Sequence, residues 1–396
     1  MELNQIIDKF IEIYGGDKSD IRVFASPGRV NLIGEHTDYN GGFVFPAALT
    51  MKTTIVCRKR ADNKIVLRAT DLPDVVEADI SNLENYKDLK WGDYQIGVAY
   101  ELSKKGYDIV GLDMLYDDTV PHGSGLSSSA AIEVATALCF TTFSNEKNGI
   151  DKEIDMVEMA VIGQKAENDY VGVNCGIMDQ FASAMGKKDC AIFLDCKDLS
   201  YKYAHLDLKG KKILISNTNK KHKLGESKYN ERRSECEKGF EMLKKGLPDK
   251  NCLGEISYEE FEANRHLITD KTVLKRIEHV ICEDDRVLKS IDALNSGDIE
   301  TFGKLMNASH DSLRDLYEVT GNELDTLVDE ARKIDGVLGS RMTGAGFGGS
   351  TVTIIEEGSI DKFIEEVGKH YTEKTGLTAH FYVSDIGDGG HEIKEF

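Results

Sequence analysis

Polar and charged side chains gather between residues 26 and 42 (SPGRVNLIGEHTDYNGG), directly after an apolar run that predicts a strand. Arg29 carries a permanently charged guanidinium with a planar fork of donors. Glu35 and Asp38 offer acceptors, and His36 can donate or accept. This combination suits a small molecule with many hydroxyls that lies beside an anion. The alternative is a polar turn with a local salt bridge, and the density and order of these residues argue against it.

Residues 121–131 (PHGSGLSSSAA) have the composition of a phosphate-binding loop that leads into a helix. Gly123 and Gly125 let backbone N–H groups converge, and the serines add hydroxyl donors. The helix that follows is apolar on nearly all sides, which predicts a buried helix whose first N–H groups and dipole face the ligand. No Gly-Lys-Ser/Thr follows the glycines, so the loop is not of the Walker A type. A serine-capped helix start is the alternative, but it needs only one serine.

A second acidic pattern combines Asp179, which Gly176 precedes and Gln180 follows, with Glu167 on a predicted helix upstream. One carboxylate could act as a base and the other as a metal ligand. From spacing alone, solvated surface acids are the better interpretation, because charged residues are common in this part of the chain.

A third pattern is the glycine-rich segment 339–350 (GSRMTGAGFGGS), which lies between two predicted strands. Such a loop can surround a ligand or pack against another part of the backbone, and taken alone it favours neither. The phosphate loop elsewhere in the chain favours the interpretation that both segments line one site.

Composition and charge limit the functions that are open to this chain. With 396 residues, two domains are the default expectation. A net charge of −20 argues against nucleic acid or an anionic membrane as a partner. The sequence has no long apolar run, so no membrane span is expected. Its first residues do not form a basic region followed by an apolar region, so no secretory signal is expected. The eight cysteines form no C-x-x-C pair, which indicates free thiols in a reducing cytoplasm and argues against zinc.

The predicted elements mix strands and helices without a regular β-α-β alternation, which indicates an α+β fold. After about residue 220 the chain becomes mostly helical and strongly charged, so a domain boundary is expected near residue 208. Helices are predicted at 6–14, 91–105, 130–140, 154–170, 229–245, 273–293 and 299–317. Strands are predicted at 21–25, 53–58, 64–68, 112–116, 191–195 and 212–216. The chain is predicted to close with a strand–loop–strand unit at 337–355, a helix and a last strand at 379–383.

Taken together, the motifs resemble those of the galactokinase family within the GHMP small-molecule kinase superfamily. Residues 28–39 are similar to the family's sugar-binding signature, residues 121–131 to the superfamily's ATP motif, and residues 339–349 to its third, glycine-rich motif. Further similarity at 176–181, 229–237 and 309–315 extends the resemblance over essentially the whole chain. The first motif separates galactokinases from the other members of the superfamily.

The resemblance implies a two-domain GHMP kinase fold with the active site between the domains. Residues 1–208 would form an N-terminal, ribosomal-S5-like domain that binds ATP and sugar, and residues 209–396 a C-terminal, ferredoxin-like GHMP domain. The implied reaction is the ATP-dependent phosphorylation of the C1 hydroxyl of D-galactose, giving galactose 1-phosphate and ADP in galactose catabolism by the Leloir pathway.

The resemblance also implies a role for each matching residue. ATP phosphates would lie against the loop, and a Mg²⁺ ion would bind to one serine and one glutamate, oxygen ligands that suit this cation. The sugar ligands implied are Glu35, His36, Asp38, Gly176, Asp179 and Tyr229; the ATP ligands are Gly123, Ser124, Gly125, Leu126, Ser127, Ser128 and Ser129; and the metal ligands are Ser129 and Glu167. Trp91 would lie near the adenine.

Two residues are expected to carry the chemistry. Asp179 would accept the proton of the sugar C1 hydroxyl, and Arg29 would stabilise both this carboxylate and the phosphoryl group in transfer. A carboxylate is a far weaker base than an alkoxide, so the proton is expected to move late in the step.

Two alternatives remain open at this stage. The first is a kinase for a related sugar such as N-acetylgalactosamine or arabinose, since the sequence does not define the pocket at C2 or C6. The second is a non-catalytic sensor of galactose and ATP. The complete serine-alanine stretch at 127–131 and the presence of both Asp179 and Arg29 argue against the sensor. The expected location is the cytoplasm, and the oligomeric state stays open, with a monomer expected.

Overall fold

The structure, a computed structural model, describes residues 1–206, 208–220 and 225–396, without the side chains of 225–227. Helices and strands alternate irregularly along the chain, as expected for an α+β fold. The helices are α1 (Leu3–Tyr14), α2 (Asp93–Lys104), α3 (Ser128–Lys147), α4 (Met156–Lys165), α5 (Met178–Met185), α6 (Gly225–Leu243), α7 (Tyr258–Asn264), α8 (Lys271–Asn295), α9 (Ile299–Ser312), α10 (Asn322–Ala331) and α11 (Ile360–Thr375).

The described strands form three sheets. A six-stranded sheet has the order β13 (His391–Ile393), β1 (Arg22–Asn31), β3 (Pro46–Lys59), β6 (Leu112–Asp118), β4 (Lys64–Ala69) and β5 (Val76–Asp79). A four-stranded sheet has the order β10 (Val337–Thr343), β11 (Ser350–Glu356), β9 (Lys211–Asn217) and β12 (His380–Ser384). A small sheet contains β2 (Phe43–Val44), β7 (Cys190–Asp195) and β8 (Tyr201–His205).

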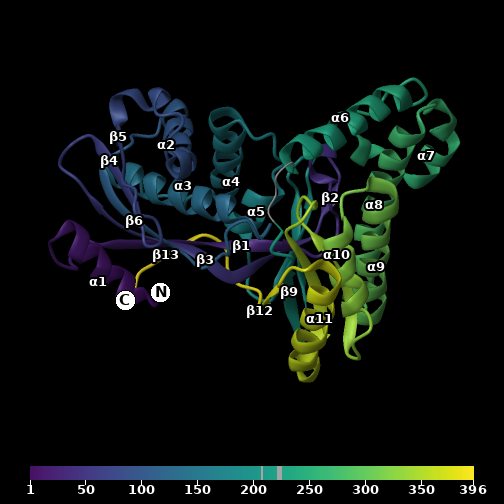
Figure 1. The fold of residues 1–396 in the computed structure, drawn as a ribbon. Helices are drawn as coiled ribbons and strands as arrows, with labels where there is room; N and C mark the ends of the chain where they lie inside the picture. Colours follow the sequence, from purple (N-terminus) through teal and green to yellow (C-terminus); the bar gives the residue numbers. More distant parts are fainter. Residues whose placement is uncertain (207, 221–224) are drawn as a thin grey trace.

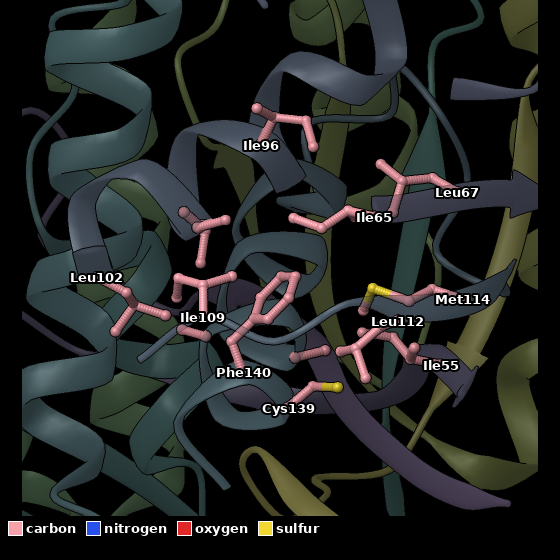
Figure 2. Close-up of a cluster of buried hydrophobic side chains, with 14 of the residues drawn as sticks. Ile55, Ile65, Leu67, Ile96, Leu102, Ile109, Leu112, Met114, Cys139 and Phe140 are labelled. Carbon is pink, nitrogen blue, oxygen red and sulfur yellow. The ribbon is translucent and has the colours of Figure 1, made fainter. Parts of the chain in front are cut away.

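Helix α3 lies in the centre of the first half of the molecule. Its residues are apolar on nearly every side and most are buried, as its composition predicts. One side packs with α2 against the six-stranded sheet, and Figure 2 shows part of this core, where Phe140 and Cys139 of α3 meet Ile55 of β3 and Leu112 and Met114 of β6. This packing determines where the amino end of α3 points.

The second half of the molecule is helical around the four-stranded sheet. Helices α10 and α11 pack on one side of it through a cluster that includes Leu327, Phe363 and Tyr371. Helix α9 lies along β10, and α8 packs against both α9 and α6. In Figure 1 the helices α6 to α9 stand at the end of the molecule opposite to α2 and β5.

The last strand returns to the first sheet. Strand β13 pairs antiparallel with β1, with Ala25 opposite His391. Leu3 of α1 and Ile393 of β13 pack in one hydrophobic cluster, so the two chain ends lie close together (Figure 1). A division of the chain at residue 208 therefore leaves this strand apart from the sheet to which it belongs. The boundary between 1–208 and 209–396 remains a prediction.

Most predicted elements are confirmed, and the differences have local causes. Strand β1 does not end at Ala25 but continues through Asn31, so the first polar motif begins inside a strand, with a shift of register between Pro27 and Arg29. The short strands β5, β8 and β13 and the helices α5, α7 and α10 were not predicted. Two predicted helices end in π-helical turns, η4 (Ala166–Val171) and η7 (Leu313–Tyr317). Within the described residues, no helix has both the length and the apolar character to cross a bilayer.

Candidate active site

A cavity of about 680 Å³ lies where the three sequence motifs meet. Its wall combines segments that are far apart in the sequence, which confirms that both glycine-rich segments face one site. From the predicted set it contains Arg29, Glu35, His36, Asp38, Gly123, Gly125, Gly176, Asp179 and Tyr229, and from the third motif Thr343, Gly344, Ala345, Gly346, Gly348 and Gly349. The predicted residues Ser124, Leu126, Ser127, Ser128, Ser129 and Glu167 lie outside this wall.

Arg29 and Asp179 form a bidentate ion pair at the centre of the site. Arg29 Nε donates to Asp179 Oδ1 at 2.8 Å, and Nη2 donates to Oδ2 at 2.7 Å. The third guanidinium nitrogen, Nη1, donates to the carbonyl oxygen of Gly125 at 2.8 Å. Ser127 Oγ donates to Asp179 Oδ2 at 2.5 Å. Arg29 is nearly buried whereas about a third of the Asp179 side chain is exposed, so the carboxylate is oriented and still accessible.

The phosphate loop packs directly against β1. The amide of Arg29 donates to the carbonyl of Leu126 at 3.0 Å, and a side chain on Gly28 would collide with the same carbonyl. Gly123 and Gly125 have φ of 67° and 76°, a region that favours glycine, and α3 begins two residues after Leu126. The loop therefore places the amino end of a buried helix beside the Arg29–Asp179 pair.

The third motif, residues 339–350, contacts both the first motif and the loop at residues 121–131. Ser350 Oγ donates to the carbonyl of Ser124 at 2.7 Å, and the amide of Gly344 donates to Glu35 Oε1 at 2.8 Å. Arg341, fully buried, approaches the same Glu35 oxygen at 3.4 Å. The third motif thus connects the loop at residues 121–131 with the motif at residues 26–42.

Helix α8 packs behind the first motif, and no sequence pattern predicted this contact. Glu283 Oε1 accepts from the amide of Gly34 at 2.9 Å and from Ser309 Oγ at 2.5 Å, and His279 Nε2 lies 3.2 Å from the carbonyl of Glu35. Burial raises the pKa of Glu283, but Arg286 and His279 lower it more, so the value falls to about 2. Glu283 is therefore an ionised acceptor inside the protein.

The carboxylates that line the cavity repel one another. Burial, together with the nearby charge of Asp179, raises the pKa of Asp38 to about 7. Burial also raises the pKa of Glu35, although Arg341 and Arg29 lower it. A side chain at Gly176 would collide with Asp38 Oδ2, which explains why a glycine stands there.

A second acidic cluster lies beside the amino end of α3. Ser129 Oγ lies 3.5 Å from Glu167 Oε1, and Gln180 Nε2 donates to Glu167 at 2.7 Å and to Glu133 at 2.8 Å. Burial and the charge of Asp179 raise the pKa of Glu167 to about 7, and burial and Glu167 raise that of Glu133 well above its usual range. Only 8% of Glu167 is exposed, so the interpretation of Glu167 as a solvated surface acid is wrong.

Trp91 lies away from the cavity wall. It belongs to the short helix η3 (Lys90–Gly92), and its ring stands edge-on to that of Tyr116 with centroids 6.3 Å apart. Its role beside an adenine remains a prediction.

The fold and the site define a GHMP kinase. The profile for the GHMP kinases N terminal domain matches residues 93–187, and that for GHMP kinases C terminal matches residues 290–373. The structure is similar in fold to the mevalonate kinase of Methanococcus jannaschii, with a TM-score of 0.66 at 20% identity over 94% of this chain and 100% of that chain.

Closer relatives define the family within this class. The galactokinase galactose-binding signature matches residues 8–59. The galactokinase of Clostridium tetani is 48% identical over 99% of this chain and 98% of its own length, and that of Clostridium acetobutylicum is 49% identical over 99% of both. The crystal structure of Lactococcus lactis galactokinase complexed with galactose has a TM-score of 0.94 and 43% identity, covering 99% of this chain and 100% of that chain. This chain belongs to the galactokinase family.

Replacing Glu283 by glutamine tests the support from α8. We expect the free energy of unfolding to fall by about 1.5–3 kcal/mol, because a charged acceptor of buried donors is lost and Arg286 is left without its partner. The measurement is unfolding in urea. The control is Asp285→Asn, which removes an exposed ion pair with Lys289 on the same helix and is expected to cost less than about 0.5 kcal/mol. If both variants lost the same free energy of unfolding, Glu283 would not stabilise the first motif.

Replacing Asp38 by asparagine tests the raised pKa of this carboxyl. A carboxyl whose pKa is higher in the folded state than in the unfolded state binds more protons when folded, so stability falls as the pH rises between the two values, here from about 4 to about 7. We expect wild type to lose stability relative to Asp38→Asn between pH 4 and pH 8, by at most about 4 kcal/mol. If the difference in stability between wild type and Asp38→Asn stayed constant with pH, the pKa of Asp38 would not be raised in the folded protein.

Proposed function

We propose that this chain catalyses the ATP-dependent phosphorylation of D-galactose at its C1 hydroxyl, giving galactose 1-phosphate and ADP. The observation that carries the proposal is the contact of one residue, Arg29, with both Asp179 and the Gly125 carbonyl. A single guanidinium thereby connects a carboxylate in a hydroxyl-binding cavity with a phosphate-type loop. Membership of the galactokinase family selects galactose, the sugar bound in the Lactococcus lactis relative.

The sugar is proposed to bind in the part of the cavity lined by carboxylates. A sugar hydroxyl both donates and accepts hydrogen bonds, so ionised carboxylates can accept from its O–H group and N–H groups can donate to its oxygen. Glu35, Asp38 and Asp179 are the acceptors on the cavity wall, and His36 and Tyr229 add further polar groups. Gly176 leaves the room that the sugar and Asp38 require.

ATP is proposed to bind with its phosphates along the loop from Gly123 to Ser129, at the amino end of α3. Backbone N–H groups and the helix dipole favour negative charge there, against the overall charge of −20. Ser129 and Glu167 would hold Mg²⁺, and their hydroxyl and carboxylate oxygens fit a hard cation. When bound, the ion neutralises charge on the phosphates. Nucleotide oxygens and water would supply the remaining ligands, since Mg²⁺ usually keeps several waters and binds substrate phosphates.

Asp179 is proposed to accept the proton of the C1 hydroxyl while the C1 oxygen bonds to the γ-phosphorus and the bond from phosphorus to the ADP oxygen breaks. Ser127 and Arg29 orient the carboxylate for this transfer. As Asp179 gains the proton its charge disappears, so the Arg29 guanidinium then faces the charge of the phosphoryl group. The chain is proposed to act in galactose catabolism in the cytoplasm.

Replacing Asp179 by asparagine tests the role of the base. The amide keeps the size of the side chain but cannot accept the proton, so we expect kcat to fall by about two or more orders of magnitude. A coupled assay of ADP release with galactose measures it. A near-normal kcat would leave Asp179 as a sugar ligand only.

Replacing Glu35 by glutamine tests the sugar site separately from the nucleotide site. The amide oxygen can still accept from the amide of Gly344, so the local fold is kept while a charged acceptor is lost. We expect the Kd for galactose to rise about tenfold and that for ATP to change less than twofold, as measured by calorimetry. Equal losses for both ligands would mean that Glu35 is structural.

A further inference from the structure

A buried arginine contacts the cavity wall without belonging to it. Arg341, on β10, is fully buried, and its Nη1 donates to the carbonyl oxygen of Asn31 at 2.8 Å and to Glu35 Oε1 at 3.4 Å. Glu35 is one of the residues that line the cavity, whereas Arg341 is not. The guanidinium can therefore act on a sugar in the cavity only through the residues that it touches.

Arg341 has few hydrogen bonds for a charge in such a position. Its Nε and Nη2 atoms are buried and have no hydrogen-bond partner within the described residues. A buried N–H group without a partner costs free energy, and a buried charge costs more unless an opposite charge compensates it. In the described part of the chain, the one ion pair of Arg341 is that with Glu35. The fold therefore gains little from this arginine, which points to a role in the site.

Charged and titratable groups face Glu35 from β10, β1 and α8 and from the first motif itself. They are Arg341 of β10, Arg29 of β1, Glu283 and His279 of α8, and Asp38 of the first motif. Burial lowers the pKa of His279 to about 4, so this ring is neutral at neutral pH. The cations that can oppose the charge of Glu35 are thus Arg341 and Arg29.

One of these two cations is already engaged. Arg29 donates through Nε and Nη2 to the carboxylate of Asp179. The charge of Glu283 is likewise matched, because Glu283 accepts from Arg286 Nε at 2.6 Å. These two pairs leave the guanidinium of Arg341 and the carboxyl of Glu35 facing each other.

Glu35 needs such a partner to keep its charge. The residue is 1% exposed, and a carboxyl buried to that extent takes up a proton unless positive charge or N–H donors oppose the effect of burial. Burial raises the pKa of Glu35, and Arg341 has the largest of the effects that lower it. The amide of Gly344, three residues after Arg341, donates to the same oxygen, Oε1, at 2.8 Å. The two contacts together orient the carboxylate.

The proton on Glu35 decides what its carboxyl can offer a sugar. An ionised carboxylate accepts at both oxygens, whereas a protonated one uses one oxygen as a donor. We propose that Arg341 is a positioning residue that keeps Glu35 ionised and oriented, so that Glu35 accepts a hydrogen bond from a sugar hydroxyl at neutral pH. The sugar part of this inference rests on the proposed function, whereas the charge of Glu35 does not.

The charge of Glu35 is tested by carbon-13 NMR of the full-length protein labelled at the side-chain carboxyl of glutamate, with Glu35→Gln used to assign the signal. We expect Glu35 to be ionised at pH 7 in wild type. In Arg341→Gln, whose amide can still donate to the carbonyl of Asn31, we expect the pKa of Glu35 to be about 1–3 pH units higher. Arg341→Lys keeps the charge and should bring this pKa back towards that of wild type.

Either of two results in these spectra would overturn the proposal: Glu35 protonated at pH 7 in wild type, or the same pKa of Glu35 in Arg341→Gln as in wild type. Arg341→Met is a second neutral variant for this comparison if Arg341→Gln does not fold, and the wild-type spectrum needs no variant of Arg341. The spectra are recorded without sugar, so they decide the charge of Glu35 whether or not the protein phosphorylates galactose.

The consequence for the sugar is tested by the Kd of galactose at pH 7. We expect Arg341→Gln to raise it about tenfold, with the Kd of ATP changed less than about twofold, because a charged acceptor is lost from the sugar site alone. In a Glu35→Gln background the same substitution should change the Kd of galactose less than about twofold, since the charge through which Arg341 acts is already absent. Arg341→Lys should recover most of the affinity.

A pH series separates this effect from a general loss of structure. As the pH rises, Glu35 regains its charge in Arg341→Gln, so the Kd of galactose should approach that of wild type. Burial and Asp179 raise the pKa of Asp38 to about 7, so the two proteins are compared with each other at every pH. A loss of affinity that is the same at every pH would contradict a role through Glu35.

The matched control is Arg332→Gln. Arg332, on α10, donates to the carbonyl of Ser340, the residue before Arg341, at 3.3 Å, and forms an ion pair with Asp311 at 2.9 Å. We expect this variant to leave the pKa of Glu35 and the Kd of galactose unchanged. An equal rise of the Kd in Arg332→Gln, or losses in Arg341→Gln and Glu35→Gln that multiply in the combined variant, would mean that Arg341 only supports the fold.

Discussion

The bidentate pair between Arg29 and Asp179 is the interaction on which the rest of the site depends. Arg29 lies at the shifted register of β1, and Asp179 lies on the first turn of α5, so the pair joins two elements separated by 150 residues. The remaining nitrogen of Arg29 contacts the phosphate loop through Gly125. Loss of either partner would leave an uncompensated charge in a largely buried place, which makes the pair costly to break.

The same arrangement sets the electrostatics of the cavity. Several carboxyls lie close together in a protein whose net charge is already −20, and burial and mutual repulsion raise the pKa of Asp38 and of Glu167 to about 7. The pKa of Glu283 is instead lowered to about 2, because Arg286 and His279 together outweigh the effect of burial. A site that is acidic at Glu35, Asp38 and Asp179 and rich in N–H groups at the amino end of α3 favours a polyhydroxylated ligand and a phosphate in adjacent positions.

Residues in contiguous motifs could be predicted from the sequence, because glycine, charge and serine patterns are local signals. Arg29, Glu35 and the loop at 123–129 belong to this group, and so does the buried helix α3. Glu283, His279 and Tyr317 could not be predicted, since they act on the first motif from more than 240 residues away and their helices look like ordinary charged helices. The prediction that Glu167 is a solvated surface acid failed for a related reason. Gln180 and Glu133 pack beside Glu167 only in the folded chain, and residue spacing does not predict such a contact. The short strands β5, β8 and β13 lack a periodic pattern of useful length.

Arg29 and Asp179 are proposed to act as one unit in phosphoryl transfer to galactose. A double-mutant cycle on kcat measures their coupling, with Arg29→Lys, Asp179→Asn and the combined variant compared in the ADP-release assay. If the two residues act as one unit, the combined variant will be about as slow as the slower single variant. If the two losses multiply, the residues act independently, which would contradict a shared role in the transfer.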